Sequence, residues 1–560
     1  MRRTLARGYG VEQFRADALA GLLVGVVALP LSMALAIAVG VPPQHGLYTA
    51  VVAGSVVALL GGSKFQVTGP TAAFVVILAP IANKFGLSGL LTAGVMAGGL
   101  LVAMGLARFG NLVRYMPYPV TTGFTSGIAA VIATLQMKDV FGLKTGKLPD
   151  HFVERVLSLF QAWRTADLRE FAVAAVTFAL LVGLGRALKR VPAPLLAISL
   201  VSLGVGLAHR FFPAFSVETI GSRFSTVVSG VVVHGIPRVP PLPAVPWGAH
   251  VPSFGEVREL VSAAFAIAML GAIESLLSAT IADGMTNTRH DPNAELVALG
   301  IGNVIAPFFG GIPATGALAR TATNVRGGAR SPIAAVVHAA AVLLSILALA
   351  PLVAWVPMAS LAALLVRVAW NMSEAHNFVG IVKGAPRSDV VVLFICFGLT
   401  VLFDMVVAVS VGLVLAAFLF MRRMADLTES RLRLDSVAED GEEPTDLPRG
   451  VIVYEIDGPL FFGAAQRAMN ALQSSRSDRF RVLVLDLGRV PIIDATGFAA
   501  LENAISGVIR AKKRVVIAGP LPRPQYVFER NALERKYPGL VIAPSRERAL
   551  SEAAALAAAP

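Results

Sequence analysis

The fold depends on two short stretches of the chain, GGSKFQVTGPTAAF at residues 61–74 and GGIPATGALART at residues 310–321. Each begins with a glycine pair, continues to a Thr-Gly step and then enters an apolar run. Backbone rich in Gly and Pro is costly inside a bilayer unless it lines a cavity. Matching interruptions in two halves of a chain are typical of a transporter binding site built from broken helices. Two ordinary loops between membrane spans are the alternative interpretation.

The composition indicates a polytopic membrane protein. Of the 560 residues, 55% are hydrophobic and 15% are charged, which lies outside the range of soluble domains. The formal charge of +13 comes largely from basic residues in short loops, so the membrane explains it better than nucleic acid does. The first apolar segment, 18–39, is too long for a signal peptide. The single cysteine, Cys396, allows no intrachain disulfide and argues against a Cys-based metal site.

The apolar segments predict a helical membrane domain of fourteen segments, arranged as a 7+7 inverted repeat with two half-helices. Clusters of Lys and Arg fall on the side of the N-terminus, which the positive-inside rule assigns to the cytoplasm. We therefore expect a multi-pass protein of the bacterial inner membrane with both termini cytoplasmic. The expected segments are roughly 17–39, 45–60, 70–84, 87–107, 119–137, 170–188, 192–210, 256–283, 293–309, 315–326, 331–353, 357–372, 388–403 and 404–421.

A change of composition after Met424 predicts a second domain. We expect a transport domain at 1–424, an acidic linker at 425–450 and a cytosolic α/β domain at 451–560. The α/β pattern consists of apolar strand runs that alternate with helical runs. The strands are expected at 451–456, 482–487 and 515–518, and the helices at 464–473 and from Phe498 onward.

The run VPIIDATG at residues 490–497 resembles the signature of STAS domains. In regulatory relatives a Ser or Thr directly after the aspartate is phosphorylated, whereas this chain has Ala495 there. The resemblance therefore argues against a phosphorylation switch. Asp494 and Thr496 are instead expected to cap a helix that begins near Gly497. A cytosolic protein partner of this domain is a further expectation.

The order of motifs in the membrane domain resembles the SulP family of anion transporters. The motifs match the first, third, eighth, ninth and tenth segments of that family, and with the tail they cover almost the whole chain. The resemblance implies fourteen segments in inverted halves, a core that moves against a gate, and a homodimer. The matching stretches are PLSMA at 30–34, GVPPQHGLY at 40–48, 63–71, MLGAIESLL at 269–277, 303–311 and Arg320 with Thr321.

Within this family, three stretches resemble a bacterial C4-dicarboxylate transporter. They are GPTAAFVVIL at 69–78, WNMSEAH at 370–376 and LFDMV at 402–406. Many SulP proteins have Gln after the first-span proline and an aromatic residue four positions later. This chain has Leu31 and Leu35 there, and a more apolar wall fits a substrate with a carbon skeleton between its charges.

The N-termini of the two half-helices are the predicted site for a small anionic substrate. They offer free backbone N–H groups and the positive ends of helix dipoles. Glycines let the backbone approach the ligand closely, and threonine hydroxyls add donors. The substrate-binding residues we expect are Thr68, Gly69, Thr71, Ala72, Ala73, Phe74, Thr315, Gly316, Ala317, Leu318 and Arg320.

Two intramembrane charges carry further expectations. The resemblance implies that Arg320 occupies the place of a substrate-attracting arginine, and the alternative is an arginine that snorkels to water near a helix end. Glu274 lies mid-span and must face a cavity, find a partner or hold a proton. Ser278 shares its helix face. We expect both to couple transport to a proton, with sodium as the alternative ion and a structural Glu274–Arg320 pair as the alternative role.

The sequence thus predicts proton-coupled uptake of C4-dicarboxylates such as succinate and fumarate, by an elevator-like mechanism. The first alternative is a transporter of bicarbonate, sulfate or chloride, coupled to sodium in one version. The second is a membrane-anchored regulator that acts through its STAS tail, and a channel is a third. The sequence contains no P-loop and no supported catalytic arrangement, so we expect neither an enzyme, nor a metal, nor a cofactor.

Overall fold

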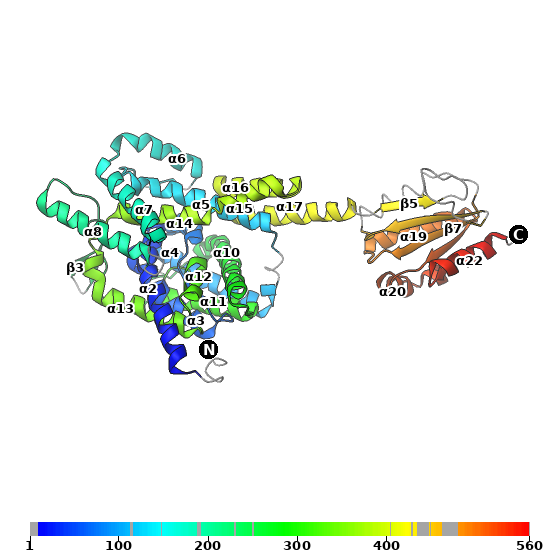
Figure 1. Ribbon diagram of the computed structural model, residues 1–560, viewed down its shortest axis with the longest axis horizontal. Helices are drawn as coiled ribbons and strands as arrows, with labels where there is room; N and C mark the ends of the chain where they lie inside the picture. Colours follow the sequence, from blue (N-terminus) through cyan, green and yellow to red (C-terminus); the bar gives the residue numbers. More distant parts are fainter. Residues whose placement is uncertain are drawn as a thin grey trace. The chain divides into compact units, whose positions relative to one another are not determined.

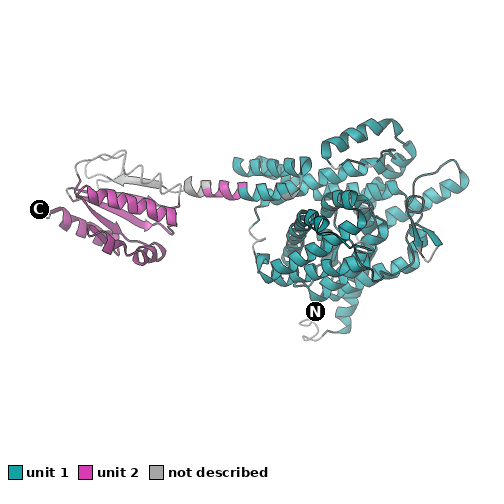
Figure 2. Ribbon diagram, turned by 180° about the vertical axis from the view of Figure 1, so that it is seen from behind, with its two compact units in different colours: residues 1–414 teal, residues 415–560 magenta. Residues whose placement is uncertain are grey.

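The computed structural model describes residues 9–111, 116–146, 148–149, 151–187, 192–228, 231–248, 251–403, 405–426, 429–433, 447–448, 450–461 and 480–558. The chain forms two compact units, Met1–Val414 and Leu415–Pro560 (Figure 2). The first unit is built largely of helices, and the second is a sheet with helices (Figure 1). The division falls inside α17 (Met405–Asp426), ahead of the boundary at 424 that we expect from the composition.

The described helices cover the fourteen expected membrane segments, and α6 (Phe152–Gln161) and α15 (Ala375–Gly384) lie between them. Two expected segments, 70–84 and 87–107, form one element that changes direction at Gly86, which has a φ of 67°. Eight of the described helices are long and apolar enough to cross a bilayer on their own. The elements are α2 (Val11–Val39), α3 (Pro43–Leu60), α4 (Ala72–Leu106), α5 (Tyr118–Val140), α7 (Leu168–Ala187), α8 (Ala193–Phe211), α10 (Phe254–Thr286), α11 (Pro292–Ile305), α12 (Leu318–Arg326), α13 (Ile333–Val353), α14 (Met358–Met372), α16 (Arg387–Leu402) and α17.

These helices pack as two groups. The first group, which we call the core, consists of α2, α3, α4, α10, α11, α12 and α13, and its helices pack mainly on one another. The second group, the gate, contains α5, α7, α8, α14 and α16. Glycines allow the closest approaches within each group. A side chain at Gly98 would meet the backbone of α11, and one at Gly123 would meet that of α16.

The long connection between α8 and α10 contacts both groups. It contains α9 (Ile220–Arg223) and the hairpin of β2 (Ser225–Val228) and β3 (Val231–His234). Backbone N–H groups of this connection donate to the turn before α14, from Ile220 to Val356 O (3.0 Å) and from Gly221 to Ala354 O (2.8 Å). On the core side, Gln44 Nε2 donates to Thr226 Oγ1 (3.2 Å). The connection therefore links core and gate at one end of the unit.

The second unit has a five-stranded sheet in the order β5-β6-β7-β8-β9, in which β5 is antiparallel and the other strands are parallel. Successive strand residues point to opposite faces of the sheet. Both faces carry buried apolar side chains, because helices cover each of them. One face packs against α19 and α20, and the other against α22. The elements are β5 (Glu429–Arg433), β6 (Val451–Asp457), β7 (Val482–Arg489), α19 (Ala495–Arg510), β8 (Arg514–Ala518), α20 (Pro522–Arg530), α21 (Leu533–Lys536), β9 (Leu540–Ala543) and α22 (Arg546–Ala558).

Two expectations for this unit need correction. The stretch expected as an acidic linker, 425–450, contains β5, which pairs with β6 and so belongs to the sheet. Helix α19 begins at Ala495, so Asp494 is its N-cap and accepts from Gly497 N (2.6 Å), whereas Thr496 already lies inside the helix. The expected helix at 464–473 lies outside the described residues.

Candidate functional site

The two Thr-Gly steps form a crossing inside the first unit. Thr68 pairs with Gly316 and Gly69 with Thr315 in a short antiparallel ladder, β1 (Thr68–Gly69) with β4 (Thr315–Gly316). Ala317 N also donates to Val67 O (2.8 Å). The two extended stretches thus satisfy each other's backbone groups, as non-helical backbone at membrane depth requires. The antiparallel pairing is what an inverted repeat demands.

Each strand of this crossing leads directly into a helix. α4 begins at Ala72 and α12 begins at Leu318, and neither N-cap residue, Thr71 or Ala317, makes a side-chain cap hydrogen bond. The first-turn N–H groups are therefore not used by a cap. Ala72, Ala73 and Phe74 are buried, whereas Thr71 is partly exposed and Leu318 is 42% exposed. The N-termini thus lack a side-chain cap, and each has one residue, Thr71 or Leu318, that is at least partly exposed.

Glycine is required at the centre of the crossing. A Cβ atom at Gly69 would overlap Arg320 Nη1, and a Cβ atom at Gly316 would overlap Gln66 Nε2. The strands can therefore approach these polar side chains only because both positions lack a side chain. In this structure the groups that the two glycines approach are protein side chains, and the expected approach to a ligand stays a prediction.

The three threonine hydroxyls that we expect to be ligand donors differ in their contacts. Thr315 Oγ1 donates to Gly271 O of α10 (2.9 Å), so this hydroxyl ties β4 to α10. Thr71 Oγ1 donates to Glu274 Oε2 (2.8 Å). Thr68 Oγ1 is buried and has no hydrogen-bond partner among the described residues. Thr71 and Thr315 therefore donate their hydroxyl protons to protein acceptors in this structure, in contrast to the expected donation to the substrate.

Arg320 lies in the first turn of α12 and is 1% exposed. Its Nη2 group donates to Pro70 O, but Nε and Nη1 have no partner within the described part of the chain. No acidic side chain among the described residues forms an ion pair with it, including Glu274. Snorkelling to water is excluded by the burial. Two of its N–H-bearing nitrogens are thus buried without a hydrogen-bond partner among the described residues, which is costly for a charged group.

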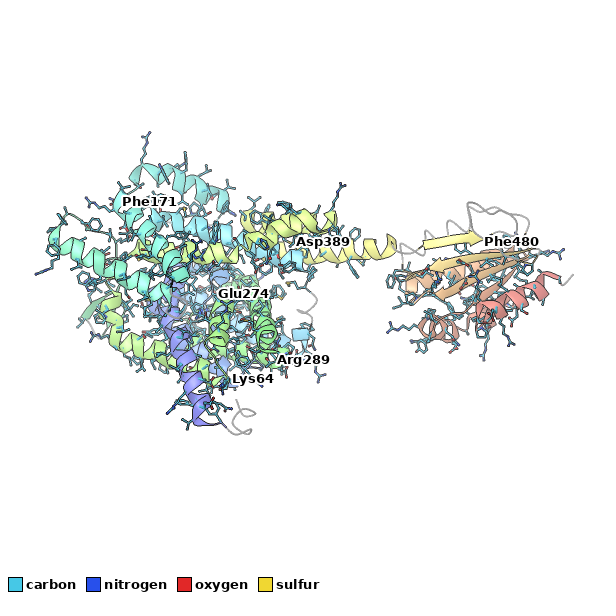
Figure 3. The ribbon with its side chains drawn as sticks, in the orientation of Figure 1. Lys64, Phe171, Glu274, Arg289, Asp389 and Phe480 are labelled. Atoms are coloured by element: carbon cyan, nitrogen blue, oxygen red, sulfur yellow. The ribbon has the colours of Figure 1, made fainter. Side chains whose placement is uncertain are left out.

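Glu274 lies in the interior of the first unit, on α10 (Figure 3). In the same view Lys64 and Arg289 lie at the end that carries the N-terminus, and Phe171 lies at the opposite end. Glu274 is partly exposed, and its described hydrogen-bond partner is Thr71 at the start of α4. The structural pair with Arg320, which was the alternative interpretation, is not formed among the described residues. Both charged groups contact the residues just before α4: the carboxylate accepts from Thr71, and the guanidinium donates to Pro70 O.

Ser278 is placed differently from Glu274. It is fully buried, and its hydroxyl donates to Thr321 Oγ1 of α12 (3.1 Å), which in turn accepts Val67 N (3.1 Å). Ser278 thus links α10 to Thr321 of α12 and, through it, to Val67, the residue before β1. The structure does not bring it together with the Glu274 carboxylate.

Residues that our interpretation of the sequence did not assign complete the site. Gln66 Nε2 donates to Ser275 Oγ (2.6 Å), which fixes the strand before Gly69 to α10. Asn303 of α11 brackets Ala314 before β4, with Nδ2 donating to its carbonyl and Oδ1 accepting its N–H (2.8 Å each). Polar residues inside apolar sequence were the available signal for both.

A cavity of about 980 Å³ lies between core and gate elements. Its walls include Ala79 and Asn83 of α4, Gln136 and Asp139 of α5, and Arg223 of α9. Ala79 is two turns along α4 from the crossing. Charged side chains of both signs line the cavity, and Arg223 forms an ion pair with Asp139 (2.8 Å). A polar cavity that reaches α4 between two helix groups is suited to ion access.

The fold defines a class of protein, a helical membrane transporter in which two broken helices cross. The family model "Sulfate permease family" matches residues 14–396, and the model "STAS domain" matches residues 445–549. The chain therefore belongs to the sulfate permease (SulP) family and is an anion transporter with a C-terminal STAS domain.

Relatives cover nearly the whole chain. "Putative sulfate transporter YvdB" of Bacillus subtilis is 39% identical over 95% of this chain and 96% of its own length. "Bicarbonate transporter BicA" of Picosynechococcus sp. is 30% identical over 97% of this chain and 95% of its own. These relatives are named for sulfate and bicarbonate, and the finer resemblance to a C4-dicarboxylate transporter finds no support among them.

Solved structures share the fold. The transmembrane domain of a cyanobacterial bicarbonate transporter BicA superposes with a TM-score of 0.62 at 27% identity, over 72% of this chain and 98% of that one. SLC26A9 superposes with a TM-score of 0.81 at 18% identity, over 98% of this chain and 92% of that one. The second likeness extends the shared architecture from the membrane helices to the C-terminal unit.

Proposed function

We propose that this chain is a secondary-active transporter that binds one small anion between the N-termini of α4 and α12. The observation that carries the proposal is Arg320, a buried guanidinium with free Nε and Nη1 groups and no acidic partner in the described chain. A buried charge of this kind needs a counter-ion, and an anion at the half-helix N-termini supplies one. Thr68 Oγ1 on the first strand is likewise buried without a hydrogen-bond partner among the described residues.

A small inorganic oxyanion, bicarbonate or sulfate, is the substrate class we favour. The names of the full-length relatives support it, and backbone N–H groups with one arginine suit oxygen atoms on a compact anion. A C4-dicarboxylate such as succinate is the second candidate. The observation in its favour is the pair Leu31 and Leu35, of which Leu35 is fully buried and Leu31 partly exposed on α2.

For coupling we propose a proton at Glu274. The carboxylate is partly exposed, and the partner seen for it in the described chain is the single Thr71 hydroxyl. A second carboxylate oxygen is thus available to a proton as the anion enters. Sodium at the same carboxylate is the alternative, because Glu274 and Thr71 both present oxygen to a cation.

The proposed transport cycle moves the core against the gate. The two helix groups that pack separately, and the cavity between them, support an elevator-like movement of the crossing. We further propose a homodimer in the bacterial inner membrane, with both termini in the cytoplasm and with the C-terminal unit available to a cytosolic protein partner. As the functional division of the chain we propose a transport domain at 1–424 and a cytosolic domain at 451–560, to whose sheet the stretch 425–450 adds β5.

Uptake into proteoliposomes tests the proposal. Radiolabelled bicarbonate, sulfate, chloride, succinate and fumarate are offered with and without an inward proton gradient, and with sodium or potassium outside. Saturable, concentrative uptake of bicarbonate or sulfate supports the favoured class. Succinate uptake alone selects the second candidate. Absence of concentrative flux for all five anions contradicts secondary-active transport and favours a regulator acting through the STAS domain.

A further inference from the structure

An apolar groove lies on the membrane-spanning surface where core and gate meet. Its volume is about 490 Å³, and its walls come from α2 and α13 of the core and from α8 of the gate. Leu29, Pro30 and Met33 form one wall, and α8 forms another from Leu195 to Leu207. The part of α13 near its C-terminal end, together with Trp355, forms the third wall.

The chemistry of the groove selects its occupant. Apart from Trp355, its polar lining side chains are Ser199 and Ser202. A bound water needs two to four polar partners, so this surface offers water little. The residues along the rim are strongly exposed, with Leu203 at 62%, Leu352 at 67% and Trp355 at 60%. In a bilayer such leucines contact hydrocarbon, and a tryptophan at a helix end is typical of the membrane interface.

The shape of the groove fits an elongated apolar chain. Leu195 and Leu207 are twelve residues apart on α8, which corresponds to about 18 Å along a helix and to more than half of the hydrocarbon thickness of a bilayer. Gly206 lines the groove, and a Cβ atom there would meet nothing within 4 Å. The groove is therefore elongated, has unfilled space next to Gly206 and is lined mainly by apolar side chains.

We propose that one acyl chain of a membrane phospholipid occupies this groove and contacts core and gate together. Because α2 and α13 belong to one helix group and α8 to the other, a movement between the groups must reshape the groove. The bound acyl chain thus becomes part of the surface along which core and gate move past each other. This second step rests on the proposed transport function, whereas occupancy by the lipid does not.

Two glycines of α8 provide a matched pair of variants. Gly206 lines the groove, whereas Gly204 is exposed and does not line it, and neither has an atom within 4 Å of its Cβ position. Gly206→Phe places a ring in the groove, and Gly204→Phe places the same ring elsewhere on α8. Both changes add the same apolar surface to one helix, so a general effect on folding affects them alike.

The full-length protein is reconstituted with phosphatidylethanolamine that carries a photoreactive diazirine on an acyl chain, and labelled peptides are mapped by mass spectrometry. We expect labelling of the α8 and α13 peptides that face the groove. Gly206→Phe lowers this labelling about fivefold, because several methylene contacts are lost, and Gly204→Phe leaves it unchanged. Equal labelling of both variants, or none in the wild type, overturns the proposal. A second copy of this chain in the groove would produce the latter result.

Transport by the same two variants tests the second step. We expect Gly206→Phe to lower the maximal rate of anion uptake several-fold at unchanged KM, and Gly204→Phe to leave both as in the wild type. If Gly206→Phe loses the labelling but keeps an unchanged rate of anion uptake, the acyl chain has no role in the movement of core against gate. If the wild type itself transports no anion while groove labelling persists, the transport proposal fails and the lipid site stands.

Discussion

The two broken helices share a backbone design and differ in their side chains. Both begin after a Thr-Gly strand, and both have N-termini without a side-chain cap. The first turns of α4 bury Ala72, Ala73 and Phe74, whereas α12 buries Arg320, Thr321 and Asn324. The repeated backbone therefore builds a symmetric pair of N–H clusters, and the side chains make it electrically asymmetric.

The asymmetry also assigns the two charges to different partners. The guanidinium on α12 reaches back to Pro70 at the start of the other half-helix, and the Glu274 carboxylate binds Thr71 next to it. Arg320 and Glu274 form no ion pair with each other in the described structure, so neither charge neutralises the other. We infer that the anion binds on the Arg320 side and that the coupling ion binds on the Glu274 side.

Removal of the α12 charge is expected to have the largest effect. Arg320→Gln should lower kcat/KM for anion uptake by about 10- to 100-fold, because charge-assisted hydrogen bonds contribute about 1.5–3 kcal/mol. Arg326→Gln is the matched control, since Arg326 is the last residue of the same helix and is exposed. Initial uptake rates across anion concentrations measure both variants. An equal loss of kcat/KM in Arg320→Gln and Arg326→Gln would mean that the effect of charge does not depend on the position of Arg320 at the crossing.

Neutralisation of the carboxylate on the other side should change coupling more than binding. Wild-type uptake is expected to rise as the external pH falls, because the inward proton gradient grows. Glu274→Gln should retain anion exchange and lose this pH response, with concentrative uptake reduced by about tenfold, the factor for 1.4 kcal/mol. Glu259→Gln, an exposed change on the same helix, is the control. A retained pH response with no sodium requirement removes Glu274 from coupling.

A methyl group on the first strand should disturb the second half-helix through Arg320. Gly69→Ala places a Cβ atom against Arg320 Nη1, and crowding of this kind costs about 1–3 kcal/mol. We expect KM for the anion to rise about fivefold or more, with a smaller change in kcat. Gly99→Ala in α4 is the control, because nothing lies within 4 Å of its Cβ position. Similar KM values for both variants would contradict the contact between the halves.

The hydroxyl of Thr321 is expected to contribute to the stability of the fold. Thr321 Oγ1 accepts from Val67 N and from Ser278 Oγ, so Thr321→Val leaves two buried donors unpaired. The expected loss is about 1–3 kcal/mol. It should appear as a lower unfolding midpoint of the purified protein in detergent. Thr323→Val changes a partly exposed threonine of the same helix and should leave the midpoint close to that of the wild type.

Helix α19 of the second unit provides the opposite case, a helix N-terminus that is capped. Asp494 accepts from Gly497 N, so a side chain caps this N-terminus, whereas the N-cap residues of α4 and α12 make no such hydrogen bond. Asp494→Ala should cost about 1 kcal/mol and raise hydrogen exchange in the first turn of α19 several-fold. Thr496→Ala is expected to have a smaller effect, because Thr496 lies inside the helix. Equal effects would contradict this assignment of the cap.

The comparison also separates what the sequence could predict from what it could not. Interruptions rich in Gly and Pro predicted the broken helices, and a charged residue in apolar sequence marked Arg320 and Glu274. Side-chain direction was not predictable, because the residues that Thr315 and Ser278 contact lie on α10 and α12 at distant positions in the chain. β5 was missed because its pairing with β6 is a contact across the acidic stretch.

Protection of a cysteine at the α12 N-terminus tests the central claim most directly. In a Cys396→Ser background, Leu318→Cys places a thiol at the exposed start of α12, and Arg326→Cys places one at its far end. Alkylation of each is timed with and without a saturating concentration of the transported anion. We predict that the anion slows alkylation at position 318 and leaves position 326 unaffected. Equal rates at position 318 with and without an anion that is transported would contradict binding at the crossing of the half-helices.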